Sequence, residues 1–159
     1  MKKLFFVISN KLDSNLYAEE EQQQPVVYLI DDDDDDRDIF SIALNRAQVD
    51  AVCLTAKNGS EALTDLNDTI KTPNFIFIDL NMPHMSGKEC LQEIKKRPML
   101  RDIPAVIYTT SSREQEAEEL MKMGAAHYLV KPDSLGKLTR VLKELITGND
   151  MPYFINMTA

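Results

Sequence analysis

The sequence predicts a doubly wound α/β fold, in which helices cover both faces of a parallel sheet. Two observations carry this prediction. Short apolar runs alternate five times with segments whose apolar residues recur at helical spacing. One of these runs, residues 75–78, is apolar throughout, which is typical of a strand buried on both faces.

The first half of the chain supplies three expected strands, at residues 25–30, 50–56 and 75–79. The first is rich in β-branched residues, which favour strands. Between the strands, apolar residues at helical spacing predict a helix that ends near Ala47, and a second helix is expected at residues 58–70.

The second half continues the alternation. Strands are expected at residues 104–108 and 126–130. One helix begins at Ser86, and another is expected to be capped by the side chain of Ser112. A strongly amphipathic last helix covers residues 135–146.

The length of 159 residues suits one domain with a core of its own. We expect the folded domain at residues 25–148, because residues 18–24 are polar and resemble a solvated linker. Residues 1–24 are then a flexible N-terminal extension, and residues 149–159 a loose C-terminal tail. The eleven residues after Gly148 are too few to build an effector domain.

Composition restricts the partners and the compartment. The net charge of −8 argues against direct binding of nucleic acid or of anionic membranes. No apolar run approaches the roughly 20 residues that a membrane-spanning helix needs. Cys53 and Cys90 are far apart and form no paired motif, as expected for reduced thiols in the cytoplasm.

Polar side chains stand at the ends of four predicted strands. Asp31 and Asp32 follow the first strand, Asp79 ends the third, Thr109 follows the fourth and Lys131 follows the fifth. The carboxyl ends of parallel strands share one edge, where ligands bind in open α/β sheets. Three carboxylates so close together repel unless a cation joins them, and Mg²⁺ prefers such oxygen ligands.

This cluster suits phosphoryl chemistry. Once a metal neutralises the site, the carboxylate of Asp79 can act as a nucleophile and become an acyl phosphate. Thr109 could donate a hydrogen bond to one phosphoryl oxygen, and Lys131 could pair with another.

Several stretches together resemble the receiver domain of bacterial two-component response regulators, of which the chemotaxis protein CheY is the type. The resemblance covers about residues 25–148 and implies a flavodoxin-like (βα)5 sheet with strand order 2-1-3-4-5. The matching stretches are residues 29–32, 78–83 with Met85 and Gly87, 107–110, and 124–125 followed by 128–132.

The resemblance implies that Asp79 accepts a phosphoryl group from a sensor histidine kinase or a histidine phosphotransfer protein. It also implies a cofactor, Mg²⁺ or Mn²⁺, held by Asp31, Asp32, Asp79 and the backbone carbonyl of Asn81. The chain would be a phosphoacceptor that assists its own phosphorylation and dephosphorylation, and not an enzyme.

For the remaining residues, the resemblance implies that Thr109 and Lys131 bind the phosphoryl group. Thr109 and Tyr128 would then form the switch, in which Tyr128 rotates inward when Thr109 moves. Tyr128 should lie on the same side of its strand as Val130.

Residues 31–36 are six consecutive aspartates, whereas the family usually has an acidic pair followed by mixed residues. Alignment on Arg37 makes Asp31 and Asp32 the pair. Residues 33–36 then fall in the loop and the first helical turn, where negative charge is favourable. We interpret them as a solvated acidic cap, and the alternative is that they strengthen metal binding.

Three other families fit less well. A haloacid-dehalogenase-type phosphatase needs a second aspartate where this chain has Asn81. The first loop of a flavodoxin is rich in Ser, Thr and Gly, whereas six aspartates would repel its phosphate. A calcium loop starting at Asp32 would have Arg37 in place of its glycine and Ala43 in place of its glutamate.

We therefore predict a single-domain receiver that signals by contact with a downstream protein target or with a second copy of this chain, or that passes its phosphoryl group onward. Its output surface should comprise the fourth helix, the fifth strand and the fifth helix, including Ala117, Leu120, Met121 and residues 135–146. The alternative function is a protein-interaction module of the same fold that is not phosphorylated.

Overall fold

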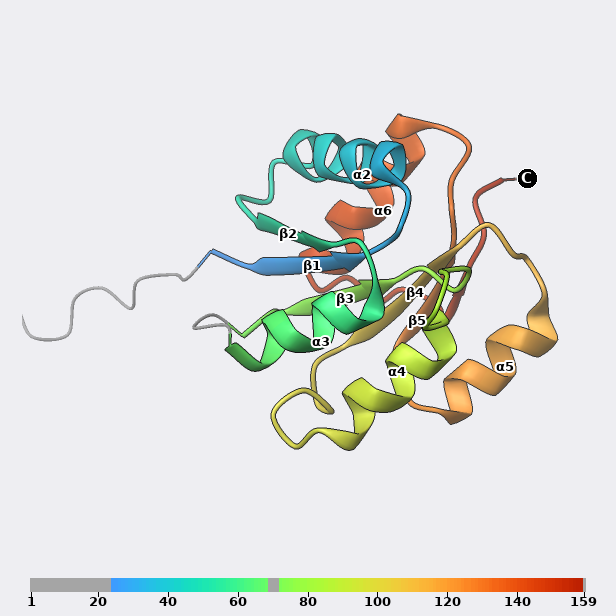
Figure 1. Ribbon diagram of the computed structural model, residues 1–159. Coiled ribbons are helices and arrows are strands. Elements are labelled where there is room, and N and C mark those ends of the chain that lie inside the picture. Colours follow the sequence, from blue (N-terminus) through green and yellow to red (C-terminus); the bar gives the residue numbers. More distant parts are fainter. Residues whose placement is uncertain (1–23, 69–71, 159) are drawn as a thin grey trace, which may run out of the picture.

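A computed structural model describes residues 24–68 and 72–158. In these residues a six-stranded parallel sheet has the order β2-β1-β3-β4-β5-β6 (Figure 1). The order predicted for the first five strands is confirmed, and β6 is an addition beside β5. The strands are β1 (Val26–Ile30), β2 (Val52–Ala56), β3 (Phe75–Ile78), β4 (Ala105–Thr109), β5 (His127–Val130) and β6 (Phe154–Ile155).

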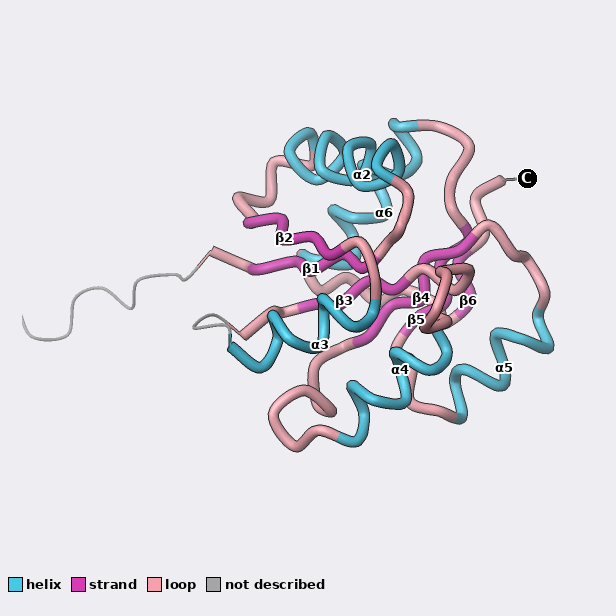
Figure 2. The backbone as a smooth tube through the Cα atoms, in the orientation of Figure 1, coloured by secondary structure: helices cyan, strands magenta, loops and turns pink. Residues whose placement is uncertain are grey.

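The helices cover both faces of the sheet, as predicted. In Figure 1, α2 and α6 lie above the sheet, and α3, α4 and α5 lie below it. Short loops join strands to helices (Figure 2). The helices are α2 (Asp34–Arg46), α3 (Gly59–Asp68), α4 (Gly87–Lys96), α5 (Glu114–Lys122) and α6 (Leu135–Ile146).

Alternating side chains of the strands divide the core into two apolar layers. Phe77 packs with Phe40 of α2 and Leu142 of α6 on one face. On the other face its neighbour Ile76 packs with Leu91 of α4 and Leu120 of α5. Because β3 is buried from both sides, the next residue along the chain arrives at a fixed position on the sheet edge.

Two helix starts that the sequence predicted have different outcomes. The helix expected to begin at Ser86 is confirmed, and Ser86 also caps it: its hydroxyl accepts a hydrogen bond from the Glu89 backbone N–H at 3.3 Å, and the Glu89 carboxylate accepts one from the Ser86 N–H at 2.8 Å. The Ser112 cap is wrong, because Arg113 is the residue that precedes α5. The Ser111 hydroxyl instead accepts from the Arg113 N–H at 3.4 Å, which satisfies that donor.

The prediction of a loose C-terminal tail is also wrong. β6 pairs in parallel with β5, and the backbone N–H of Tyr128 donates to the Tyr153 carbonyl at 2.7 Å. The Phe154 ring stacks on the Tyr128 ring, with centroids 5.5 Å apart and planes inclined by 17°. The Tyr153 hydroxyl donates to the carbonyl of Ala117 in α5 at 2.7 Å. Packing against β5 and α5 therefore orders this segment.

Some predictions fall outside the described residues, namely the flexible extension, except for its last residue, and the end of the helix expected near Ile70. The domain boundaries themselves stay a prediction. Among the residues that the structure describes, no helix is long and apolar enough to cross a membrane.

Candidate functional site

The carboxyl ends of β1 and β3 bring Asp31 and Asp79 together. Ile30 pairs with Ile78, so that the two aspartates follow at the same level on neighbouring strands. The Asp79 N–H donates to the Ile30 carbonyl at 2.9 Å, and the Asp31 N–H donates to the Ala56 carbonyl at 3.1 Å. These bonds extend the ladder by one residue and fix both backbones at the edge.

Asp31, Asp32 and Asp79 form a cluster that fits a divalent cation. Each offers one carboxylate oxygen, and these oxygens lie within 4.8 Å of one another. Asp31 is 0% exposed and Asp79 is 6% exposed, whereas Asp32 faces solvent. Hard oxygen donors at this spacing suit an ion such as Mg²⁺ or Mn²⁺.

The carboxylates of Asp31 and Asp79 are buried and therefore poorly solvated. The pKa of Asp31 and that of Asp79 are both raised above the ordinary aspartate value, chiefly because burial disfavours the charged form. The negative charge of Asp31 raises the pKa of Asp79 further, and the ammonium of Lys131 opposes the shift in both. A cation at this edge would favour the ionised carboxylates.

Lys131 reaches into the same cluster from the end of β5. Its Nζ lies 2.8 Å from Asp31, 2.6 Å from Asp36 and 3.5 Å from Asp79. Burial by itself lowers the pKa of Lys131, but the bonds to Asp31 and Asp36 and the charge of Asp79 outweigh burial and raise it. Lys131 therefore carries a positive charge at neutral pH.

Thr109 is the last residue of β4 and is completely buried. It pairs with Val130 in β5, and its carbonyl accepts a hydrogen bond from the Lys131 N–H at 2.7 Å. Its hydroxyl accepts one from the Ser111 N–H at 3.2 Å. The sequence-based placement of Thr109 and Lys131 on neighbouring strand ends is confirmed.

The loop from β3 to α4 packs directly against Asp79. A Cβ atom on Gly87 would lie 2.2 Å from the Asp79 carbonyl oxygen, so this position requires glycine. The Gly87 N–H donates to the Leu80 carbonyl at 3.0 Å, which closes the loop. Asn81 is exposed in this loop, and the role of its carbonyl as a metal ligand stays a prediction.

The interpretation of residues 33–36 as a solvated acidic cap is only partly right. Asp33 does cap α2, accepting a hydrogen bond from the Asp36 N–H at 3.1 Å, and Asp34 pairs with Arg37. Asp36, however, turns toward the cluster and contacts Lys131. Sequence reasoning missed this residue, although an N-cap at Asp33 would have placed Asp36 in the first helical turn beside the sheet edge.

Tyr128 lies in β5 on the same side as Val130, as predicted, and both belong to the core beside α5. Its hydroxyl lies 3.0 Å from a Glu116 carboxylate oxygen and 3.2 Å from the Ser111 carbonyl, either of which can accept its proton. The ring is already completely buried, beneath Phe154. In this state the ring therefore already lies inside the core, and its rotation on phosphorylation stays a prediction.

Two residues expected on the output surface are also buried. Ala117 and Leu120 of α5 are 3% and 1% exposed because they face the sheet, whereas Met121 is 46% exposed. Part of the expected surface along β5 is occupied by β6.

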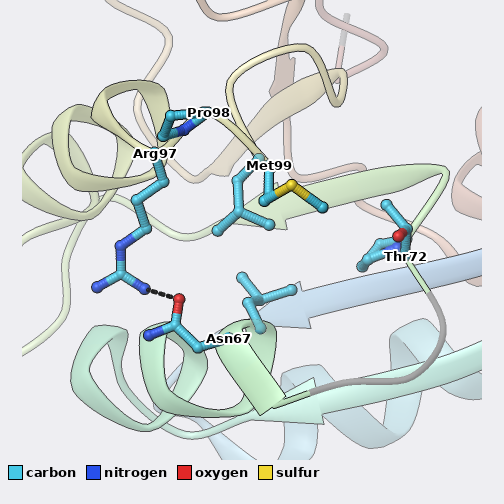
Figure 3. A pocket seen from close by; sticks show the side chains of 8 residues that line it. Asn67, Thr72, Arg97, Pro98 and Met99 are labelled. Atoms are coloured by element: carbon cyan, nitrogen blue, oxygen red, sulfur yellow. Dashed lines mark hydrogen bonds between the residues drawn. The ribbon is translucent and has the colours of Figure 1, made fainter.

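A cavity of about 450 Å³ lies away from this cluster, between the ends of α3 and α4 and the segment that precedes β3 (Figure 3). Arg97 spans part of its wall and donates to the Asn67 side chain at 2.8 Å and to the Leu63 carbonyl at 2.7 Å. The described residues that line this cavity include no carboxylate, so they do not share the chemistry of the strand ends.

Comparison with known families agrees with the fold. The sequence model of one family, the response regulator receiver domain, matches residues 27–143. The chain belongs to this family. Receiver domains are the phosphoacceptors of two-component systems, bind divalent metal ions and contact histidine kinases or phosphotransfer proteins.

Individual response regulators are similar to the chain over part or most of its length. The two-component response regulator ARR15 of Arabidopsis thaliana is 40% identical over 93 residues, which cover 58% of this chain but only 42% of that protein. The phosphorylated cyanobacterial phytochrome response regulator RcpA is 27% identical with a TM-score of 0.71, over 80% of this chain and 97% of that one. The Mn²⁺-bound form of response regulator Rcp1 is 28% identical with a TM-score of 0.69, over 80% and 99%.

Proposed function

We propose that Asp79 accepts a phosphoryl group from a phosphohistidine of a sensor histidine kinase or a histidine phosphotransfer protein. One observation carries this proposal: Asp31, Asp32, Asp79 and Lys131 converge on a single sheet edge. Asp79 is the acceptor because it follows β3, which lies between β1, the strand followed by the other two acids, and β5, the strand followed by Lys131.

In this reaction a carboxylate oxygen of Asp79 attacks the phosphorus atom. The bond from phosphorus to the donor's imidazole nitrogen breaks, and its electron pair stays on the imidazole. When bound by Asp31, Asp32, Asp79 and the Asn81 carbonyl, Mg²⁺ or Mn²⁺ supplies positive charge for the phosphoryl oxygens. These four residues are the proposed ligands.

Two further residues stabilise the transferred group. The ammonium of Lys131 is 3.5 Å from Asp79, close enough to pair with a phosphoryl oxygen after a small movement. Thr109 is proposed to donate its hydroxyl proton to another phosphoryl oxygen. Attack of water on the same phosphorus would release inorganic phosphate and restore the carboxylate, so the chain assists both steps on its own side chain.

The signal is proposed to leave through Thr109 and Tyr128. Ser111 connects them: its N–H donates to the Thr109 hydroxyl, and its carbonyl lies 3.2 Å from the Tyr128 hydroxyl. A downstream protein or a second copy of this chain would distinguish the two states by its affinity for the surface of α5, β5 and α6. The free thiols of Cys53 and Cys90 agree with a cytoplasmic location.

The alternative is a module that binds proteins without being phosphorylated. It does not explain why the buried carboxylates and Lys131 lie together. Incubation with acetyl phosphate and Mg²⁺, followed by intact-mass analysis, distinguishes the two functions. We expect the mass of one labile phosphoryl group on the native chain and none on Asp79→Asn. An adduct of equal yield on that variant would reject Asp79 as the acceptor.

A further inference from the structure

Lys131 is held mainly by residues other than the proposed acceptor. Its two shortest carboxylate contacts are to Asp36 at 2.6 Å and Asp31 at 2.8 Å, and Asp79 is farther away at 3.5 Å. Asp31 belongs to the group of carboxylates that can hold a metal, whereas Asp36 does not. Asp36 is therefore a counter-ion of Lys131 outside the group of possible metal ligands.

The position of Asp36 follows from the first turn of α2. Its backbone N–H is bonded to the Asp33 cap, and one turn further along Phe40 packs against Phe77, with ring centroids 4.9 Å apart. The Lys131 ammonium lies 5.0 Å above the ring of Tyr108, which also contacts Phe40. Aromatic packing thus fixes the helix that carries Asp36 relative to the strand ends that Lys131 reaches.

A phosphoryl group on Asp79 would add a new anionic partner for the Lys131 ammonium. It adds a charge of about −1.5 to −2, with acceptor oxygens next to Lys131. To pair with them, the ammonium must give up or share its present partners. A metal ion held by Asp31 would engage its charge, and Asp36 would then be the carboxylate that still competes for Lys131.

We propose that Asp36 is a positioning residue that holds the Lys131 ammonium in the resting state and competes with the phosphoryl group for it. The second half of this inference rests on the proposed function. Asp36 thereby weakens the contact between Lys131 and the phosphoryl oxygens.

The resting contact can be tested without metal or phosphoryl donor. Nuclear magnetic resonance of the lysine side-chain ¹⁵Nζ groups should detect the protected protons of Lys131 in the native chain. In Asp36→Asn and Asp36→Ala these protons should exchange faster with water and their signal should weaken. In Asp35→Asn the signal should persist, because Asp35 is an exposed neighbour in the same helical turn.

The competition is tested by the affinity for beryllofluoride, a phosphoryl mimic, in saturating Mg²⁺. Asp36→Asn should tighten this binding by about twofold to fivefold, the range expected for a partly exposed ion pair. Asp35→Asn removes the same charge without the contact and should leave this affinity nearly unchanged.

A double-mutant cycle separates this contact from a general effect of charge. In a Lys131→Gln background, Asp36→Asn should change beryllofluoride affinity no more than Asp35→Asn does. An equal effect of the two aspartate variants in the native background would overturn the competition, and an unchanged Lys131 signal in Asp36→Asn would overturn the resting contact. Since that signal needs no phosphorylation, failure of the proposed function is distinguishable from failure of this inference.

Discussion

Two regions of the same sheet are held together by different forces. The acidic edge, made of Asp31, Asp32, Asp79 and Lys131, gathers charges that burial leaves poorly solvated. The β6 contact, made of Tyr128, Tyr153 and Phe154, consists of stacked rings and neutral hydrogen bonds. A cation or phosphoryl group that binds at the acidic edge changes the electrostatic energy of that edge directly. It can change the β6 contact only by moving the atoms that lie between the two regions.

That connection is short. Lys131 donates its backbone N–H to the carbonyl of Thr109, the Thr109 hydroxyl accepts from Ser111, and the Ser111 carbonyl lies beside the Tyr128 hydroxyl. A displacement of Thr109 toward Asp79 would therefore disturb the partners of Tyr128. This arrangement suggests that the acidic edge receives the signal and that the β6 contact responds to it.

The largest expected difference between the acidic edge and the β6 contact is their response to metal binding. Mg²⁺ should stabilise the native chain against denaturant by mass action, by about 2.7 kcal/mol at a hundredfold excess over the dissociation constant. Asp32→Ala should remove most of this stabilisation, because it deletes a proposed ligand. Asp35→Ala should retain it, and if Asp35→Ala were instead the damaging change, the metal ligands would lie elsewhere in the acidic run.

The next effect should be confined to the β6 contact. Phe154→Ala removes the ring that covers Tyr128 and should lower the free energy of unfolding by about 1–2 kcal/mol, less than for a fully buried phenylalanine because Phe154 is partly exposed. The increment from Mg²⁺, measured by denaturant unfolding of the same variant, should stay as in the native chain. Loss of that increment would contradict the separation of the two regions in the resting state.

A smaller difference should appear in the dependence of stability on pH. The pKa values of Asp31 and Asp79 are raised in the folded state, so the folded chain binds more protons than the unfolded chain just above the ordinary aspartate pKa. Their contribution to stability therefore falls as the pH rises through this interval. Saturating Mg²⁺ should flatten this part of the profile, because it favours the ionised carboxylates.

The β6 contact should respond at the opposite end of the pH scale. Burial and nearby groups raise the pKa of Tyr128 and of Tyr153 to about 12. Stability from these two residues should decline as the pH rises from the ordinary tyrosine value toward 12, and Mg²⁺ should not alter that decline. Denaturant unfolding across the pH range measures both profiles, and equal sensitivity of both ends to Mg²⁺ would argue against two distinct regions.

The strand ends could be predicted from the sequence because their placement follows from local patterns. Continuous apolar runs identify buried parallel strands, and the residue after each run must then fall on one edge. This reasoning placed Asp31, Asp79, Thr109 and Lys131 correctly, whereas their roles in phosphoryl transfer remain proposals.

The features that the sequence did not predict depend on contacts between distant residues. Asp36 and Lys131 are 95 positions apart, and nothing in the local pattern distinguishes Asp36 from its acidic neighbours. β6 has two residues, too few for a periodic pattern, and it forms because β5 offers an open edge and Tyr128 an apolar ring. Ser112 is not the cap because α5 begins one residue later than expected, after Arg113, whose side chain forms no capping hydrogen bond.

The central claim, that charge arriving at Asp79 is transmitted to the β6 contact, is tested most directly by amide chemical shifts with and without beryllofluoride in the presence of Mg²⁺. Our account predicts large changes in the loop after Asp79 and a continuous series at residues 109–131 that extends to Tyr153 and Phe154. The same addition to Asp79→Asn should change none of them. Changes confined to the Asp79 loop in the native chain, with residues 109–131 and β6 unaffected, would contradict the account.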